Sequence, residues 1–312
     1  MLKFTGWMTM VLFFLLVVAT GAHALATRTW VSGVGDNLNP CSRTAPCKTF
    51  AGAISNTAAG GEINVLDPGD FGAVIITKAL TINGSGGSIA GILAPGSNGI
   101  EVNAGANDSV ILRNLDINGM GTGLSGILFL NGKSLRVENS KIYGFNQYGF
   151  AFEPAAASTF SIDRTVLHNN VLGGLYVKPG ANPGSAYGTV SGSSFSNNQF
   201  GVWAEDRSMV TVSNSVAGNN FGNGFMAQST TDAAEITLSG AVASGNVTGV
   251  EASGTRAVVY MSGTATTQNT TGIMTMNSGS VLSHASSIII GNTNDGVPTG
   301  YLPQYSGALV IY

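Results

Sequence analysis

The stretch Gly201-Val202-Trp203-Ala204 opens a repeat that Asn219-Asn220 closes. Its pattern is a glycine, a hydrophobic residue, any residue and usually a second hydrophobic residue. The pattern recurs along most of the chain, starting at Gly99, Gly126, Gly149, Gly174, Gly201, Gly224, Gly249, Gly272 and, in a degraded form, Gly296. Successive glycines are 27, 23, 25, 27, 23, 25, 23 and 24 residues apart. A period near 24 residues is typical of a stacked solenoid.

Each repeat contains three short strand patterns. In the repeat of Gly201, the second pattern is Val210-Thr211-Val212 and the third is Val216-Ala217. Alternating small and apolar residues predict strands with one buried face, and no repeat has the period of a helix. Three strands per turn, each stacked on its counterpart, predict an all-β, three-sheet parallel β-helix of about nine to ten coils.

Residues 1–26 have the pattern of a secretory signal peptide. Lys3 supplies the positive start, and an apolar run extends from Trp7 to Val18, too short to span a bilayer comfortably. Small residues allow cleavage after Ala24 or Ala26. We therefore expect a secreted or periplasmic protein with no membrane span in the mature chain.

The composition fits one solenoid domain. Charged residues make up 9% of the chain, glycines number 44, and the net charge is −3. Because no basic stripe is present, nucleic acid is not an expected partner. We expect a cap at residues 27–60, the β-helix at 61–296, and a C-terminal cap or tail at 297–312. The oligomeric state is left open.

The cap is expected to contain a disulfide loop and a helix. Cys41 and Cys47 are the only cysteines, and in an oxidising compartment such a pair predicts a disulfide. A metal or redox site would need further ligands or a C-x-x-C spacing. Residues 49–58 place Phe50, Ala53, Ile54 and Thr57 on one side at helical spacing. This predicts a short helix that ends at Gly60-Gly61, covers the first coil and precedes a strand from Glu62.

The opening of the chain resembles a known family. The run from Trp30-Val31-Ser32 through Asn39-Pro40, then Ala45-Pro46-Cys47-Lys48-Thr49-Phe50, is similar to the first segment of secreted bacterial right-handed β-helix proteins, which include pectate-lyase-like proteins. With the repeats, the resemblance covers about residues 30 to 296. It implies a right-handed β-helix with an N-terminal capping helix. The chain departs from the group at Cys41 and Cys47, where Gly and Phe are usual.

Residues that alternate with the buried ones define a candidate binding strip. Since residues i and i+2 share a face of a strand, Ile127, Phe129, Phe150, Phe152, Val202 and Ala204 are expected to point inward. The intervening residues then point outward. Stacking of neighbouring coils at about 4.8 Å brings Tyr176 beside Trp203 and puts Lys178 between Glu153 and Glu205.

This strip has two interpretations. Tyr176 and Trp203 can bind a sugar ring, with Lys178 and Glu205 holding its hydroxyl groups. Alternatively, the two rings only cover apolar neighbours, and Lys178 sits in a solvated ion pair worth less than about 1 kcal/mol.

Signs of enzymatic activity are weak. The resemblance implies an Asp/Glu cluster holding calcium, with an Arg or Lys base, but we find no sequence motif of such enzymes. The remaining acid–base candidates are Glu153, Lys178, Glu205, Asp206 and Arg207. We expect no metal and no cofactor, because the corner asparagines Asn170, Asn198, Asn220, Asn246, Asn269 and Asn292 are better explained as a ladder that bonds neighbouring backbone and tolerates left-handed conformations.

Three functions remain open at this point. The first is non-catalytic binding of a polysaccharide or cell-surface glycan. The second is a polysaccharide lyase or glycoside hydrolase that uses the charged strip, and the third is a structural or adhesin-like element.

Overall fold

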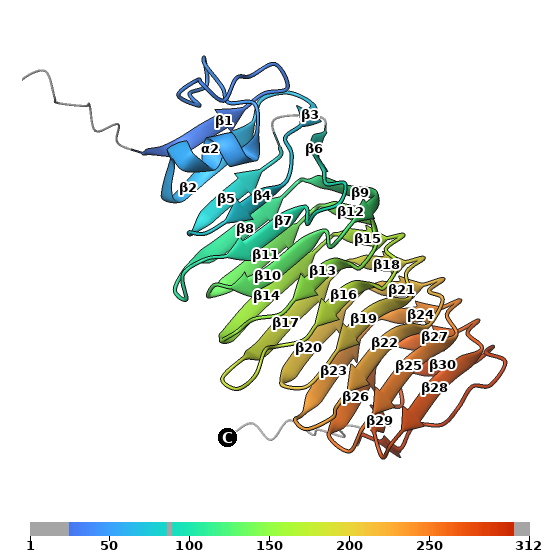
Figure 1. The fold of residues 1–312 in the computed structure, drawn as a ribbon. Coiled ribbons are helices and arrows are strands. Elements are labelled where there is room, and N and C mark those ends of the chain that lie inside the picture. Colours follow the sequence, from blue (N-terminus) through green and yellow to red (C-terminus); the bar gives the residue numbers. More distant parts are fainter. Residues whose placement is uncertain (1–24, 86–88, 303–312) are drawn as a thin grey trace, which may run out of the picture.

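A computed structural model describes residues 25–85 and 89–302. Within these residues the chain winds through three parallel sheets, named A, B and C here, in the repeating order A, B, C (Figure 1). The predicted all-β parallel β-helix is thus confirmed, and the 9 strands of sheet C match the lower of the two coil numbers expected. The predicted signal segment up to residue 24 and the tail from residue 303 lie outside the described residues.

The strands of each sheet stack in chain order. Sheet A consists of β1 (Ala26–Val31), β2 (Thr57–Val65), β5 (Leu80–Asn83), β8 (Ser109–Arg113), β11 (Ser134–Glu138), β14 (Ala157–Asp163), β17 (Ser185–Ser191), β20 (Ser208–Ser213), β23 (Ala234–Ser239), β26 (Ala257–Ser262), β29 (Ser280–Ser283) and β31 (Gly300–Tyr301). Sheet B consists of β3 (Gly69–Asp70), β6 (Ala90–Leu93), β9 (Asp116–Gly123), β12 (Lys141–Phe145), β15 (Val166–His168), β18 (Ser194–Ser196), β21 (Val216–Gly218), β24 (Val242–Ser244), β27 (Ala265–Thr267) and β30 (Ile288–Ile289). Sheet C consists of β4 (Val74–Ile76), β7 (Ile100–Asn103), β10 (Ile127–Asn131), β13 (Tyr148–Phe152), β16 (Gly173–Val177), β19 (Phe200–Ala204), β22 (Asn223–Gln228), β25 (Thr248–Ser253) and β28 (Thr271–Met276).

Helix α2 (Phe50–Asn56) takes the place of a sheet C strand in the first circuit, between β1 and β2. The side chain of Thr49 caps it by accepting a hydrogen bond from the Gly52 N–H. Phe50 and Ala53 are buried, and the Phe50 ring lies 5.2 Å from that of Phe71. The helix ends earlier than expected. No helix among the described residues is long and apolar enough to cross a membrane.

The core is a column of inward side chains that repeat from coil to coil. The inward residues predicted from the glycine pattern, Ile127, Phe129, Phe150, Phe152, Val202 and Ala204, are all 0% exposed. Phe129 of β10 pairs in register with Phe152 of β13, and their rings stack 4.4 Å apart. Each coil therefore buries its apolar face against its neighbours, as a solenoid requires.

The corner after sheet B holds a continuous asparagine ladder. The N–H of Asn198 donates to Oδ1 of Asn220 at 3.1 Å, and the N–H of Asn220 donates to Oδ1 of Asn246 at 3.0 Å. The predicted ladder is confirmed. The expectation that the ladder asparagines themselves adopt the left-handed conformation was wrong. The left-handed conformation belongs to the preceding residues, Asn169, Asn197 and Asn219. The ladder asparagines therefore have one role at the corner, which is to form hydrogen bonds between neighbouring coils.

Cys41 and Cys47 are joined by the predicted disulfide. The loop that it closes lies along the free edge of β1. The Trp30 N–H donates to the Cys41 carbonyl at 2.8 Å, and the Cys47 N–H donates to the Trp30 carbonyl at 3.0 Å. The loop thus pairs with the C-terminal part of this edge, around Trp30, which would otherwise offer unpaired backbone groups to another chain.

Candidate functional site

The predicted strip lies on the outer face of sheet C, across β13, β16 and β19. Tyr176 and Trp203 are in register, with ring centroids 5.0 Å apart. Tyr148 stacks on the other side of Tyr176 at 4.3 Å. Gly173, opposite Tyr148, lacks a side chain that would meet the Tyr148 ring. The strip is therefore an aromatic ladder, not a pair of isolated rings.

This ladder changes the expectation for Tyr176. The sugar-binding interpretation needs the Tyr176 ring to face solvent, but Tyr176 is only 6% exposed, as the alternative interpretation expects. Its two faces are covered by Tyr148 and Trp203, so no sugar ring can stack on it. Trp203, at the edge of the ladder, is half-buried and packs against Phe200 at 4.8 Å.

The charged part of the strip is held together by specific bonds. Nζ of Lys178 lies 3.1 Å from Oε2 of Glu205, and the Tyr176 hydroxyl donates to Oε1 of Glu205 at 2.9 Å. Burial raises the pKa of Tyr176, and the hydrogen bond to Glu205 adds to the effect. Tyr176 therefore stays protonated and acts as a donor at ordinary pH.

Glu153 and Tyr148 border this group. Burial raises the pKa of the Glu153 carboxyl, Lys178 opposes that shift, and Glu205 reinforces it. Burial and the nearby carboxylates of Glu153 and Glu205 raise the pKa of Tyr148 to about 12. The structure thus gathers Glu153, Lys178 and Glu205 around one polar patch, as the coil stacking predicted.

The side chains of Asp206 and Arg207 bond to residues of neighbouring turns and not to Glu205. Asp206 accepts hydrogen bonds from the Thr230 N–H at 2.7 Å and from the Thr231 hydroxyl at 3.0 Å. Arg207 bonds to the Gly184 carbonyl at 3.0 Å and forms an ion pair with Asp232 at 2.8 Å. Both side chains tie neighbouring turns together, so they do not join the patch around Glu205.

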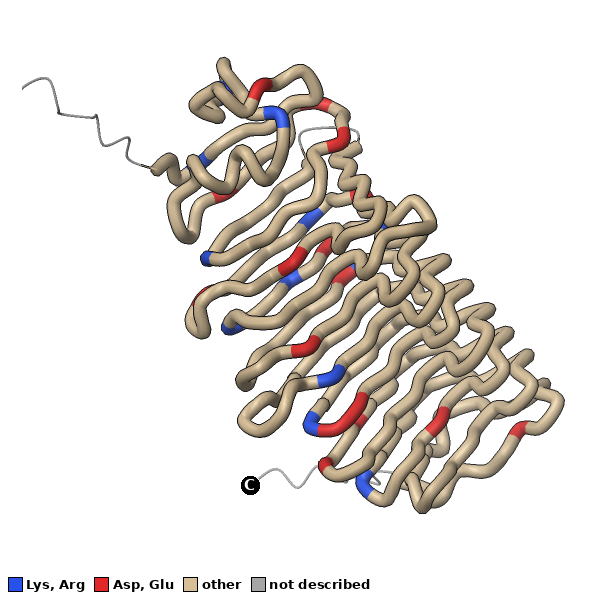
Figure 2. Tube along the Cα trace, in the orientation of Figure 1, with Lys and Arg blue, Asp and Glu red and all other residues tan. Residues whose placement is uncertain are grey.

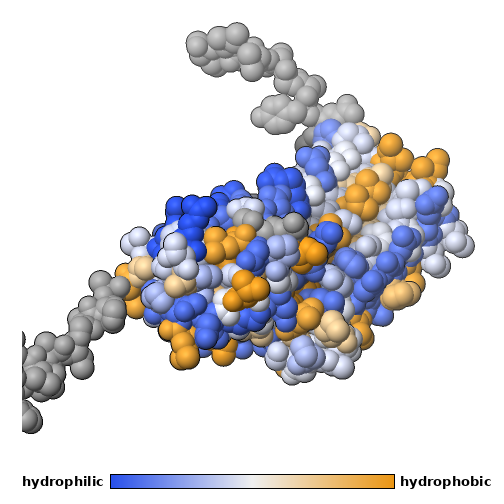
Figure 3. All heavy atoms as spheres, turned by 90° about the horizontal axis from the view of Figure 1, so that it is seen from above, coloured by the Kyte–Doolittle hydropathy of each residue, from blue (hydrophilic) through white to orange (hydrophobic). Residues whose placement is uncertain are grey.

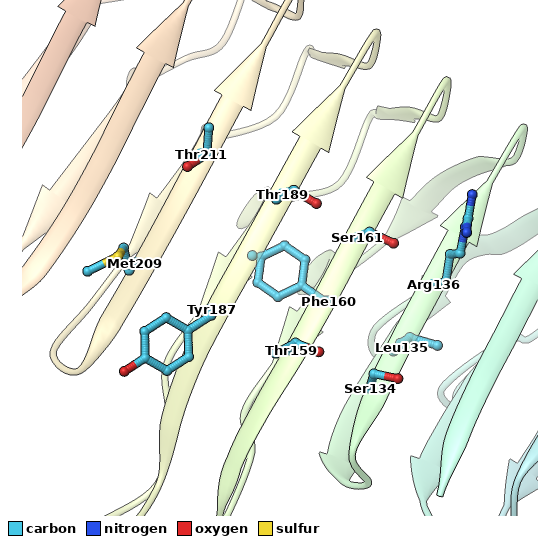
Figure 4. Close-up of a pocket in the computed structure, with 11 residues that line it drawn as sticks. Ser134, Leu135, Arg136, Thr159, Phe160, Ser161, Tyr187, Thr189, Met209 and Thr211 are labelled. Atoms are coloured by element: carbon cyan, nitrogen blue, oxygen red, sulfur yellow. The ribbon is translucent and has the colours of Figure 1, made fainter. Parts of the chain in front are cut away.

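A second site lies on sheet A. A shallow hollow of about 490 Å³ crosses β11, β14, β17 and β20. Figure 4 shows its lining, in which Tyr187 and Met209 are 52% and 45% exposed. The outward hydroxyls of Ser161, Thr189 and Thr211 follow one another in register across it, with Arg136 at one end.

The glycine repeat did not predict this hollow, because the strand after each glycine belongs to sheet C and the hollow lies on sheet A. The alternation in Tyr187-Gly188-Thr189-Val190-Ser191 would have placed the tyrosine and the hydroxyls on an outward face.

A metal does not fit the residues present. In the described residues, no group of three or more His, Cys, Asp or Glu side chains is arranged to hold an ion. The acidic cluster that the resemblance implied for calcium has no counterpart there, and no chemical step is derived through a metal.

The stacked coils define a class, the parallel β-helix proteins. Within it, the chain belongs to the family described as the right-handed β-helix region, whose model matches residues 98–294. The resemblance to right-handed β-helix proteins is thereby confirmed for the fold and the family. No curated protein sequence matches the chain.

Solved structures share the fold. The pectate lyase Pel9A superimposes with a TM-score of 0.62 at 15% identity, over 89% of this chain and 78% of that one. An alginate lyase from Paenibacillus sp. str. FPU-7 gives a TM-score of 0.56 at 14% identity, over 89% of this chain and 99% of the lyase. Identities this low establish the shared fold alone.

Proposed function

We propose that this protein binds an extended polysaccharide along the outer face of sheet A. The observation that carries the proposal is the half-exposed Tyr187 ring, which stands in the hollow beside Met209 and the hydroxyl row of Ser161, Thr189 and Thr211. An amphipathic ring offers apolar area next to a polar tip. Hydroxyls that both donate and accept suit a ligand rich in hydroxyl groups.

The direction of the hollow also suits a chain-like ligand. Its lining comes from four successive strands, β11, β14, β17 and β20. At about 4.8 Å per strand the row extends for about 14 Å, enough for more than one sugar unit. Arg136 at one end forms an ion pair with Glu138 but is mostly exposed, so it can also donate to a carboxylate of a ligand, and acidic polymers belong in the test.

A binding experiment tests the proposal. Titration with oligosaccharides of polygalacturonate, alginate and neutral polymers should identify a ligand, and Tyr187→Ala should weaken its binding about tenfold or more with little change in melting temperature. Tyr301→Ala is the matched control, because Tyr301 is exposed but lies outside the hollow. A panel without any ligand, or Tyr187→Ala that binds like wild type, contradicts the proposal. The first result would favour the structural or adhesin-like element.

The sheet C strip supports a second candidate, a polysaccharide lyase or glycoside hydrolase. The supporting observation is the raised pKa of the Glu153 carboxyl beside the Glu205–Lys178 ion pair, since a carboxyl group that keeps its proton to higher pH suits the role of a general acid. New reducing or unsaturated ends in the same incubations would reveal turnover. Lys178→Ala should then abolish turnover while binding persists, and Trp203→Ala reports whether the half-buried ring contributes to binding.

We also infer that the protein is exported. The apolar leader within residues 1–26 and the Cys41–Cys47 disulfide both suit an extracytoplasmic protein. N-terminal sequencing of the protein from cell fractions should find a start at Leu25 or Thr27 outside the cytoplasm. A cytoplasmic protein that begins at Met1 would refute export.

A further inference from the structure

Half of the solenoid has a face without charge. Between residues 165 and 294, the charged residues lie in sheets A and C or in the turns from C to A: Lys178, Glu205, Asp206, Arg207, Asp232, Glu235, Glu251 and Arg256. Sheet B and its two corners carry none in this range, every residue of which the structure describes. In Figure 2 the turns on the right of the lower stack are correspondingly tan down to the last turn.

The outward side chains of this face form one mainly apolar row and one mainly polar row, the latter made of His168, Ser196, Gly218, Ser244 and Thr267. One row runs in register across six strands of sheet B: Val166, Ser194, Val216, Val242, Ala265 and Ile288. The adjoining corner adds Val171, Phe221 and Val247, which are 60%, 71% and 50% exposed. We call this surface, from β15 to β30 with its corner, the B face. In Figure 3, hydrophobic residues are interspersed with hydrophilic ones at the surface on the right, the side of sheet B in Figure 1.

We propose that the B face joins two copies of this chain in a two-fold symmetric dimer. The exposed row from Val166 to Ile288 supplies apolar contact area beside uncharged polar groups, and the cores of protein interfaces are depleted in charge in the same way. A two-fold contact places a patch against itself, so charges of one sign would repel their own copies. A face with no charge avoids that repulsion, and equal coil spacing lets the ridges of one copy fit between those of the other.

The B face is large enough to bind a second copy of the chain. Six strands at about 4.8 Å, and about eight residues along each strand and corner at about 3.3 Å, give a surface of roughly 24 by 26 Å, which bends at the corner residues Asn169, Asn197 and Asn219. This area of about 600 Å² per partner lies at the low end of the range for specific protein interfaces. A polyanion is a poorer occupant, because it would need the cations that this face lacks.

Sedimentation equilibrium of the purified protein tests the proposal. Wild type should be a dimer, and Val216→Lys and Phe221→Glu should each weaken the dimer at least about 100-fold, because each buries two unpaired charges across the two-fold axis. Ser239→Lys is the matched control, an exposed serine on sheet A in the same coil as Val242. It should leave the dimer unchanged.

Folding is checked separately by thermal melts. Val216 is 41% exposed, so a lysine there should leave the melting temperature of the monomer nearly unaltered. If either variant fails to fold, Val247→Lys at the same face replaces it. A wild type that stays monomeric up to about 100 µM, B-face variants that remain dimeric, or an equal effect of Ser239→Lys would each overturn the proposal.

Discussion

Phe160 occupies the space that a side chain at position 188 would need. The two residues pair in register, and a Cβ added to Gly188 would lie 2.0 Å from Cζ of Phe160. The ring has little room to move, because it packs 5.8 Å from Phe150 and 4.7 Å from Phe152. The glycine at position 188 is therefore a packing requirement of the aromatic core.

Gly188→Ala should destabilise the protein by about 1–3 kcal/mol through overpacking. Gly218→Ala is the control, since the nearest atoms to an added Cβ there are at ordinary distances of 3.6 Å. Urea unfolding of both variants gives the comparison. If the two variants are equally stable, the Phe160 ring can move to make room for the added methyl group.

The half-buried carboxyl of Glu153 should make the stability of the protein depend on pH. Burial places its folded pKa above the usual value of 4.5, against the pull of Lys178 and with help from Glu205. A proton bound more tightly in the folded state stabilises it at low pH, and this contribution is lost as the pH rises through the folded pKa. Glu153→Gln should thus melt higher than wild type near pH 7, with the gap closing towards about pH 4. A difference in melting temperature that does not change with pH, or that has the opposite sign, would argue against a raised pKa of Glu153. The same pH-dependent difference in Glu235→Gln would also argue against it.

The residue pattern predicted which side chains face inward, but not how the outward rings pack. Alternation fixes Phe150 and Val202 in the core, and both are 0% exposed. Tyr176 alternates outward as expected, yet Tyr148 covers it, with Gly173 leaving the room that the ring needs. This contact joins residues 28 positions apart and depends on ring orientation, which a periodic pattern does not contain.

At the scale of elements, neighbouring strands decide where a strand begins. We expected the helix to run to Gly60-Gly61, because glycine usually ends such elements. Instead β2 starts at Thr57, which pairs with Ala26 of β1, while Gly61 pairs with Leu80 of β5. The gain from pairing on both sides outweighs the low strand propensity of glycine.

The disulfide loop leads to a prediction for an element. Replacing Cys41 and Cys47 by serine should cost about 2 kcal/mol in loop entropy and loosen the cover of the β1 edge. We expect an increased rate of aggregation, because a free strand edge is a template for pairing between chains. Light scattering at raised temperature measures this rate. The pair Ser42→Ala and Thr44→Ala, within the same loop, is the control and should aggregate like wild type.

At the scale of the whole molecule, the asparagine ladder couples one coil to the next. In the middle of the ladder, Nδ2 of Asn220 donates to the Phe195 carbonyl at 3.2 Å and to Oδ1 of Asn246 at 2.8 Å. Near the C-terminal end, Asn292 donates to Oδ1 of Asp295 at 2.9 Å, where the ladder stops. Because each coil contacts only its neighbours, a break in the middle divides the stack, whereas a break at the end loosens one coil.

Asn220→Ala should therefore cost about 2–4 kcal/mol, since it leaves the buried N–H of Asn198 and the Phe195 carbonyl without partners. Asn292→Ala should cost about 1 kcal/mol, because Asn292 is only half-buried and water can replace its bonds. Hydrogen exchange locates the damage. With Asn220→Ala, protection should fall in the coils on both sides, from β18 to β24, whereas with Asn292→Ala it should fall only around β27 to β30. If both variants lose protection evenly along the stack, the solenoid unfolds as one cooperative unit, and the ladder does not couple its coils one at a time.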